Sequence, residues 1–199
     1  MAQNEFTPLQ LDALKEVSNI GAGNAATALS MMLGKKIDMT VPAVNVIKLE
    51  ELINNVGEEE VAGIIVRVIG DIQGSVLLVF KGHVAKQIVS MLIGKQEEEF
   101  SELGNSALCE IGNIVSGSYM NAIAQFTGLA VAPSVPAVAY DMLSAILATT
   151  FVESGQYDEY ILDIETIFLD EESSSLGANF YYIPVPGSIE KILKTIGLK

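Results

Sequence analysis

The 199-residue sequence contains one cysteine, one histidine and no tryptophan. The single cysteine, Cys109, excludes an internal disulfide bond. Because His83 is the only histidine, the sequence also lacks a Cys/His cluster with the spacing of a metal site. We therefore expect a protein of a reducing compartment that has no metal ion or other cofactor of its own.

Positive charge is also scarce. Lysine and arginine number 11 against 25 aspartate and glutamate residues, which gives a formal net charge of −14. This charge argues against binding to nucleic acids and against electrostatic attachment to anionic membranes. No uncharged apolar run approaches the roughly 18 residues needed to cross a bilayer, and the first ten residues do not resemble a secretion signal. We expect a cytoplasmic chain with no membrane insertion, whose partners are proteins.

Half of the residues are hydrophobic, and the chain contains an internal duplication. Residues 11–46 align with residues 105–140 at a constant shift of 94, and 12 of the 36 aligned pairs are identical. About two identities are expected from background composition. We therefore predict two repeats, about 7–95 and about 101–198, within a single domain spanning residues 1–199. One domain is expected because three strands and one long helix bury little apolar surface on their own.

Each half shows the same succession of local patterns. The segment Thr7-Pro8-Leu9-Gln10 combines a capping box with proline at the first helical position, which predicts a helix from about Pro8 to Gly34. Its copy is expected from about Ser101 to Gly128. A strand, a short helix, two hairpin strands and a last helix follow in each half. The expected strands are about 36–47, 63–69, 74–80, 130–140, 160–169 and 179–185, and the expected short helices are about 48–55 and 141–149.

These patterns predict an α+β fold. We expect a pseudo-two-fold duplicated domain with about six mainly antiparallel strands, on which the two long helices pack. Pro42 and Pro136 fall within predicted strands, and proline cannot donate a hydrogen bond to a neighbouring strand. The strands that contain them are therefore expected at an edge of the sheet or at a bulge.

A polar stripe runs along each predicted long helix. A helix advances about 100° per residue, so Asp12, Asn19 and Gly23 lie within about 60° of Glu16. The apolar residues of this helix centre about 165° away from Glu16, which predicts that the stripe faces outward. The second helix repeats the stripe, with the residues Ser106, Glu110, Asn113 and Gly117.

Asparagine and glycine are unusual choices for the middle of a helix. Asparagine prefers caps and turns, and glycine costs about 1 kcal/mol relative to alanine. One interpretation is that Glu and Asn are tolerated surface residues and that the glycines serve packing between helix and sheet. The other is that the glycines let a second surface approach the Glu/Asn pair. Repetition of all three positions in both halves favours the second interpretation.

The patterns Asp12-x-x-x-Glu16-x-x-Asn19-x-x-x-Gly23 and Ser106-x-x-x-Glu110-x-x-Asn113-x-x-x-Gly117 resemble the paired signature of the CheC/CheX/FliY family of chemotaxis phosphatases, with CheC-type members the closest match. The resemblance covers nearly the whole chain. It implies hydrolysis of the aspartyl phosphate on the response regulator CheY. It also implies that both Glu/Asn pairs are catalytic and enter the active site of the regulator, with the other stripe residues in support.

Asparagine suits this chemistry because its amide can both accept from and donate to a water molecule, and so hold it in line with phosphorus. Phosphoryl transfer demands little activation of the nucleophile, so positioning is a sufficient contribution. In the implied complex, Glu16 and Glu110 pair with a lysine of the regulator. The divalent metal, Mg²⁺, belongs to the regulator.

Other features of the sequence suggest different functions. The segment Gly21-Ala22-Gly23-Asn24-Ala25-Ala26 fits a dinucleotide-binding pattern, but that pattern must follow a strand and open a helix, whereas this segment is preceded by about twelve helical residues. Cys109 has no histidine partner that would activate it as a nucleophile, so a partly buried packing role is expected.

A non-catalytic adaptor is the alternative function. The family resemblance implies binding to the receptor deamidase CheD, for which Asp141 is a candidate contact.

Overall fold

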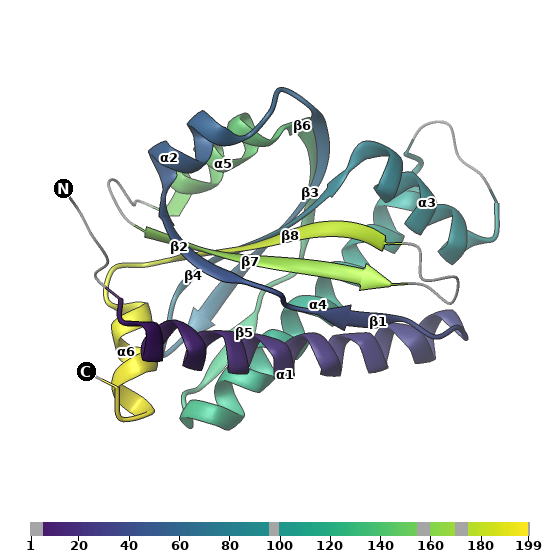
Figure 1. The fold of residues 1–199 in the computed structure, drawn as a ribbon. Helices are drawn as coiled ribbons and strands as arrows, with labels where there is room; N and C mark the ends of the chain where they lie inside the picture. Colours follow the sequence, from purple (N-terminus) through teal and green to yellow (C-terminus); the bar gives the residue numbers. More distant parts are fainter. Residues whose placement is uncertain (1–5, 96–99, 155–159, 170–174, 199) are drawn as a thin grey trace.

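One curved antiparallel sheet carries helices on both of its faces (Figure 1). The computed structural model describes residues 6–95, 100–154, 160–169 and 175–198. In chain order, the elements are α1 (Pro8–Leu33), β1 (Asp38–Thr40), β2 (Val44–Lys48), α2 (Leu49–Asn55), β3 (Glu60–Gly70), β4 (Gly74–Lys81), α3 (Gly82–Ile93), α4 (Glu102–Thr127), β5 (Val131–Pro133), β6 (Ala137–Met142), α5 (Leu143–Ser154), β7 (Tyr160–Leu169), β8 (Ser175–Pro184) and α6 (Ser188–Thr195). The same succession of helix and strand types therefore occurs twice. The combination of these helices with an antiparallel sheet confirms the predicted α+β class.

The strand order of the sheet is β1-β7-β8-β4-β3-β5, with β2 also paired to β7 and β6 also paired to β3. The strands β1 and β2, from the first half of the chain, thus lie beside the second-half hairpin β7–β8. In return, β5 and β6 lie beside the first-half hairpin β3–β4. All of these pairs are antiparallel. The two hairpins meet in the middle of the sheet, where β4 pairs with β8.

The described residues form eight strands rather than the six that the sequence predicts, because both outer strands are interrupted. The break between β1 and β2 contains Pro42, and the break between β5 and β6 contains Pro136. The prediction of two continuous strands over 36–47 and 130–140 was therefore wrong. Of the two predicted positions, an edge of the sheet or a bulge, the edge is confirmed for the strands beside both prolines.

Local capping fixes the ends of the two long helices. At the start of α1, the Gln10 N–H donates to Thr7 Oγ1 (3.3 Å) and the Thr7 N–H donates to Gln10 Oε1 (2.7 Å), which is the predicted capping box. Ser101 caps α4 by accepting from the Gly104 N–H (3.1 Å). Both helices end at a glycine in the left-handed region, Gly34 and Gly128. The predicted limits of both helices are confirmed.

Alternating side chains of the strands point to two separate hydrophobic cores. On β3, for example, Ile64 and Val66 belong to the core under α1 and α4, whereas Val61 belongs to the core under α2 and α5. Figure 1 shows these helix pairs on opposite faces of the sheet. The long helices also touch each other: a Cβ placed on Gly21 would lie 3.0 Å from the Tyr119 Cα. Close packing at Gly21 therefore fixes how α1 and α4 sit side by side.

Helix periodicity places Met32 and Phe126 opposite the Glu/Asn stripes, so both are expected to be buried, but both are exposed. Met32 is 37% exposed and Phe126 is 44% exposed, and each lies in the last turns of its helix. The prediction was wrong there because helix periodicity gives the direction of a side chain but not whether another element covers it. In the described part of the chain, no helix is long and apolar enough to span a membrane.

Candidate active site

The two Glu/Asn pairs lie on the outer surfaces of α1 and α4. Glu16, Asn19, Glu110 and Asn113 are all exposed, as are Asp12 and Ser106. The opposite faces of the same helices are buried, with Leu14 and Val17 on α1 and with Leu108 and Ile111 on α4. The structure therefore places both stripes where the helix periodicity predicts them, facing away from the sheet.

The first pair is held by the outer edge of the sheet. Asn19 Oδ1 accepts a hydrogen bond from the Val41 N–H at 3.3 Å, and Lys15 Nζ donates to the Pro42 carbonyl at 2.6 Å. The break between β1 and β2 thus lies directly against α1 at the candidate site. Because Asn19 is bonded through its oxygen, its amide orientation is set and its Nδ2 group points elsewhere.

The second pair has a different arrangement. Asn113 Nδ2 donates to Glu110 Oε2 at 3.4 Å, so the asparagine is oriented by its own glutamate. The break between β5 and β6 again lies near the helix, since Cys109 Sγ is 3.8 Å from the Pro136 carbonyl oxygen. Val135, however, is 88% exposed, whereas its counterpart Val41 is 2% exposed. The two sites therefore share their residues but differ in the segment beside them.

The stripe glycines have no packing role inside the molecule. A Cβ placed on Gly23 or on Gly117 would meet no atom within 4 Å. By contrast, a Cβ on Gly112 would lie 2.5 Å from Ile64 Cγ2, so Gly112 is a residue on which internal packing depends. The explanation that Gly23 and Gly117 serve packing between helix and sheet is therefore not supported by their surroundings.

The rival interpretations of this region can be compared with its geometry. The segment Gly21–Ala26 lies in the interior of α1, not in a loop between a strand and a helix, as expected from the sequence. Burial raises the pKa of the Cys109 thiol, which favours its protonated and unreactive form. Its Sγ faces the Pro136 carbonyl rather than the exposed stripe.

Asp141 lies at the end of strand β6 rather than at the head of a helix. The predicted helix 141–149 begins at Leu143 instead, because Asp141 and Met142 pair with β3 as part of the sheet. The apolar residues that follow are buried in the core under α2 and α5. These apolar residues therefore belong to the core and are not available for docking to a partner. Asp141 itself is exposed, and its Oδ1 accepts from the Met142 N–H at 2.7 Å.

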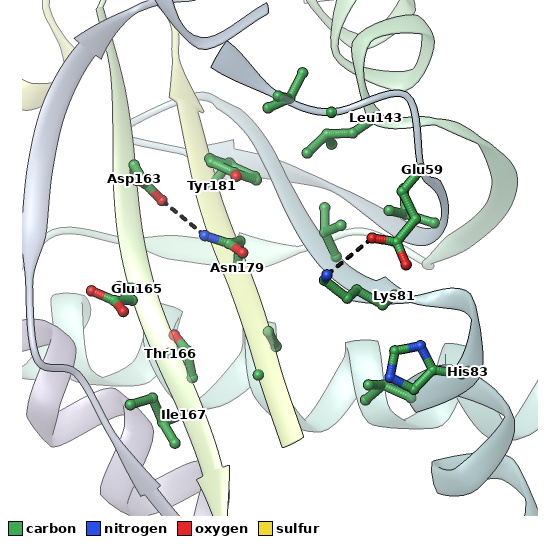
Figure 2. Close-up of a pocket in the computed structure, with 17 residues that line it drawn as sticks. Glu59, Lys81, His83, Leu143, Asp163, Glu165, Thr166, Ile167, Asn179 and Tyr181 are labelled. Atoms are coloured by element: carbon green, nitrogen blue, oxygen red, sulfur yellow. Dashed lines mark hydrogen bonds and ion pairs between the residues drawn. The ribbon is translucent and has the colours of Figure 1, made fainter. Parts of the chain in front are cut away.

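A cavity of about 710 Å³ lies on the α2/α5 side of the sheet (Figure 2). Asp163 and Asn179 face each other across its floor, with Asn179 Nδ2 3.5 Å from Asp163 Oδ1. Burial raises the pKa of the Asp163 carboxyl, while hydrogen bonds from Asn179 and Asn45 lower it. None of the predicted site residues lines this cavity. Within the described ranges, no group of three or more His, Cys, Asp or Glu side chains is placed to hold a metal ion.

The geometry limits what the two pairs can do. Each pair presents an amide and a carboxylate on a convex helix surface, with a bare glycine backbone one turn beyond the asparagine. Such a surface does not enclose a small substrate, because ligand sites of that kind are concave. It can instead be inserted into a cleft of another macromolecule, where the amide and the carboxylate would supply hydrogen-bonding groups.

Comparisons with known proteins identify similar sequences and similar folds. A profile of the CheC-like family matches residues 9–46, and a profile of the chemotaxis phosphatase CheX matches residues 61–154. The chain is 36% identical to the CheY-P phosphatase CheC of Bacillus subtilis over 196 residues, which cover 94% of each protein. Its fold is similar to that of Thermotoga maritima FliY (TM-score 0.83, 24% identity, 98% of both chains). It is also similar to that of CheX from Desulfovibrio desulfuricans (TM-score 0.58, 18% identity, 85% of this chain and 99% of the other).

Proposed function

Because the chain belongs to the CheC-like family of chemotaxis phosphatases and is therefore a phosphatase, we propose that it hydrolyses the aspartyl phosphate of the response regulator CheY by inserting its Glu/Asn pairs into the regulator's active site. The first pair is Glu16 and Asn19 on α1, and the second is Glu110 and Asn113 on α4. The observation that carries this proposal is the outward placement of both pairs, each with open space over the glycine one turn further along.

Each asparagine positions the water that attacks phosphorus. Its amide oxygen accepts one hydrogen bond from the water and its N–H group donates another, which places the water in line with the bond that breaks. The water oxygen forms a bond to phosphorus while the bond between phosphorus and the aspartyl oxygen breaks. The aspartate of the regulator leaves as a carboxylate with the electron pair, and the protons of the water pass to phosphate and solvent. Orientation suffices because the transition state is loose.

The glutamates and the metal have separate tasks. Glu16 and Glu110 pair with a lysine of the regulator, which fixes the helix in register against the phosphate. The metal ion, Mg²⁺, is held by the regulator and neutralises the charge on the phosphoryl oxygens. Asp12, Ser106 and the two stripe glycines shape the surface that enters the regulator.

The two asparagine amides are oriented by different hydrogen bonds, so the two sites are not equally preorganised for the reaction. Asn19 already has its amide orientation set by the Val41 N–H, and a carbonyl oxygen has a second acceptor position left for water. Asn113 is held by Glu110 at 3.4 Å and must exchange that contact when Glu110 pairs with the regulator. Both sites are expected to contribute, with Asn19 the more firmly oriented before docking.

The test is phosphate release from phosphorylated CheY by the wild type, Asn19→Ala, Asn113→Ala and the double variant. Loss of one preorganised hydrogen-bonding group slows catalysis roughly 10²-fold at its site. Each single variant should therefore retain the share of the other site, and the double variant should be nearly inactive. Asn54→Ala is the matched control, since Asn54 is an exposed helical asparagine on α2. A fully active double variant contradicts the proposal.

An adaptor role that involves CheD is the second candidate function. It is favoured by the exposed end of β6, where Asp141 lies beside Tyr140 and Met142, which are 40% and 42% exposed. Tyrosine and methionine are enriched at protein interfaces, and a charged residue such as Asp141 suits the polar rim of one. A pull-down of CheD with the Asp141→Lys variant tests this contact. Unchanged capture of CheD would remove Asp141 from the interface.

A further inference from the structure

An exposed leucine precedes each catalytic pair by two helical turns. Leu9 on α1 is 63% exposed and Leu103 on α4 is 56% exposed. The shift of 94 residues that relates the two halves also relates these leucines. A single exposed leucine on a protein surface needs no explanation. Two exposed leucines at equivalent positions, each beside one of two equivalent sites, do require an explanation.

Neither leucine caps its helix or packs in a hydrophobic core of the described residues. Each occupies the second position of its helix, where the caps are Thr7 and Ser101. The apolar residues that precede the caps, Phe6 and Phe100, are the ones that turn inward and pack on the core. Among the residues that the structure describes, both leucines lie outside the two hydrophobic cores.

Helix geometry places each leucine on the same surface as its catalytic pair. At about 100° per residue, Leu9 lies about 20° from Glu16, and at 1.5 Å per residue it is about 10 Å away along the axis. Ile20, which is 37% exposed, lies about 40° from Glu16 on the same side. Asp12 and Asn19 lie on the other side of Glu16. The outward face of α1 therefore has an apolar row beside a polar row.

On the second helix, Leu103 and Ile114 lie at the same angles to Glu110, and Ser106 and Asn113 lie on the other side. Ile114 is half-buried and packs against the core, so Leu103 is the exposed apolar residue of this row. A helix that docks into a groove of a partner does so with apolar side chains along one of its faces. A partner that takes in Glu110 and Asn113 would also cover Leu103.

We propose that Leu9 and Leu103 are docking residues that determine the affinity for the response regulator, by packing on apolar surface next to its phosphorylation site. This inference rests on the proposed function. The partner that covers these leucines is the regulator, because the apolar row lies directly beside the Glu/Asn pair that enters the regulator. The leucines do not touch the reacting atoms, so they add binding energy equally to the bound substrate and to the transition state. Such a contribution changes KM and leaves kcat unaltered.

The experiment measures phosphate release against the concentration of CheY phosphorylated with acetyl phosphate, one site at a time. Leu9→Ser is combined with Asn113→Ala, so that only the first site works, and Leu103→Ser is combined with Asn19→Ala. We expect KM to rise roughly tenfold in each pair relative to its parent, equivalent to about 1.4 kcal/mol, with kcat unchanged. In the same parents, Leu9→Met and Leu103→Met should keep the parental KM, because methionine retains the apolar volume of leucine.

Val152→Ser is the matched control, since Val152 is a 60% exposed apolar residue of α5, on the other face of the sheet. It should leave KM at the parental value. The proposal is overturned if KM is unchanged in either leucine variant, if kcat falls instead of KM rising, or if the variants alter the oligomeric state measured by light scattering. The Asn19→Ala/Asn113→Ala variant distinguishes failure of the docking inference from failure of the proposed function. If it is inactive while the leucine variants behave like their parents, only the docking inference fails.

Discussion

Replacing the two stripe glycines with alanine should make the protein more stable and less active at the same time. Gly23 and Gly117 lie inside helices, and a Cβ added to either would meet open space. Alanine is therefore accommodated without strain, and each substitution should raise the free energy of unfolding by about 1 kcal/mol. In a domain of this size, 1 kcal/mol corresponds to roughly 2–4 °C in Tm. The double variant should then melt roughly 4–8 °C higher than the wild type.

The activity should move in the opposite direction. If the regulator approaches the helix backbone at these glycines, an added methyl group holds the two proteins apart by about an ångström. A displacement of that size can reduce the rate about 10²-fold, because the water and the phosphorus lose their alignment. We therefore expect kcat/KM for phosphorylated CheY to fall by about two orders of magnitude in the Gly23→Ala/Gly117→Ala variant.

The matched control is Gly21→Ala on the same helix. A Cβ at Gly21 would lie 3.0 Å from both the Cα and the Cγ of Tyr119, so α1 and α4 would have to separate. Overpacking of this kind costs about 1–3 kcal/mol, and Tm should fall. Thermal unfolding by circular dichroism and phosphate release are measured on the same samples. The reasoning is refuted if the Gly23→Ala/Gly117→Ala variant is fully active, or if it melts below the wild type.

Three further predictions concern stability, metal dependence and the thiol. Asp71 accepts from the Ala130 N–H (2.8 Å) and pairs with Lys191 (3.1 Å), and these contacts lower its pKa. A depressed pKa stabilises the fold above the ordinary carboxyl pKa of about 4, and that contribution disappears as the pH falls through the lowered value. Asp71→Asn should therefore lower Tm near pH 7 but not near pH 2; an equal loss at both would count against this linkage. Chelation of divalent ions should stop phosphate release and added Mg²⁺ should restore it, while calorimetry of this chain alone should show no Mg²⁺ binding; a heat of binding would place the metal here instead. Cys109→Ser should leave phosphate release unchanged, since the half-buried thiol faces the Pro136 carbonyl; a large loss would indicate a direct part in the reaction.

The parts of the fold that depend on local chemistry could be predicted from the sequence. The limits of both long helices follow from capping residues and terminal glycines, and the outward direction of the Glu/Asn stripes follows from helix periodicity. The interruption of the outer strands could be suspected from Pro42 and Pro136, but how long the break would be depends on the strands beside it. The exposure of Met32 and Phe126 could not be predicted, because it depends on which other elements cover the ends of the two helices.

The contacts that distinguish the two sites required the three-dimensional structure. The hydrogen bond from the Val41 N–H to Asn19 joins residues 22 positions apart in sequence, and nothing in the local pattern indicates it. The opposite environments of Val41 and Val135 are equally hidden, since both occur in the same Val-Pro-Ala-Val tetrapeptide. Asp163 gives no signal in the sequence either, because an acidic residue within a strand is normally expected on a solvated face.

The arrangement of the outer strands has a consequence for how such a sheet could arise. The hairpin β3–β4 receives β6 from the other half of the chain, and the hairpin β7–β8 receives β2. A polypeptide with one half only would leave a hairpin edge unsatisfied, and open edges recruit strands from other molecules. Two such polypeptides could complete each other as a strand-swapped homodimer with the same sheet. Joining them in one chain makes the exchange independent of protein concentration, and it lets each of the two long helices acquire its own neighbours.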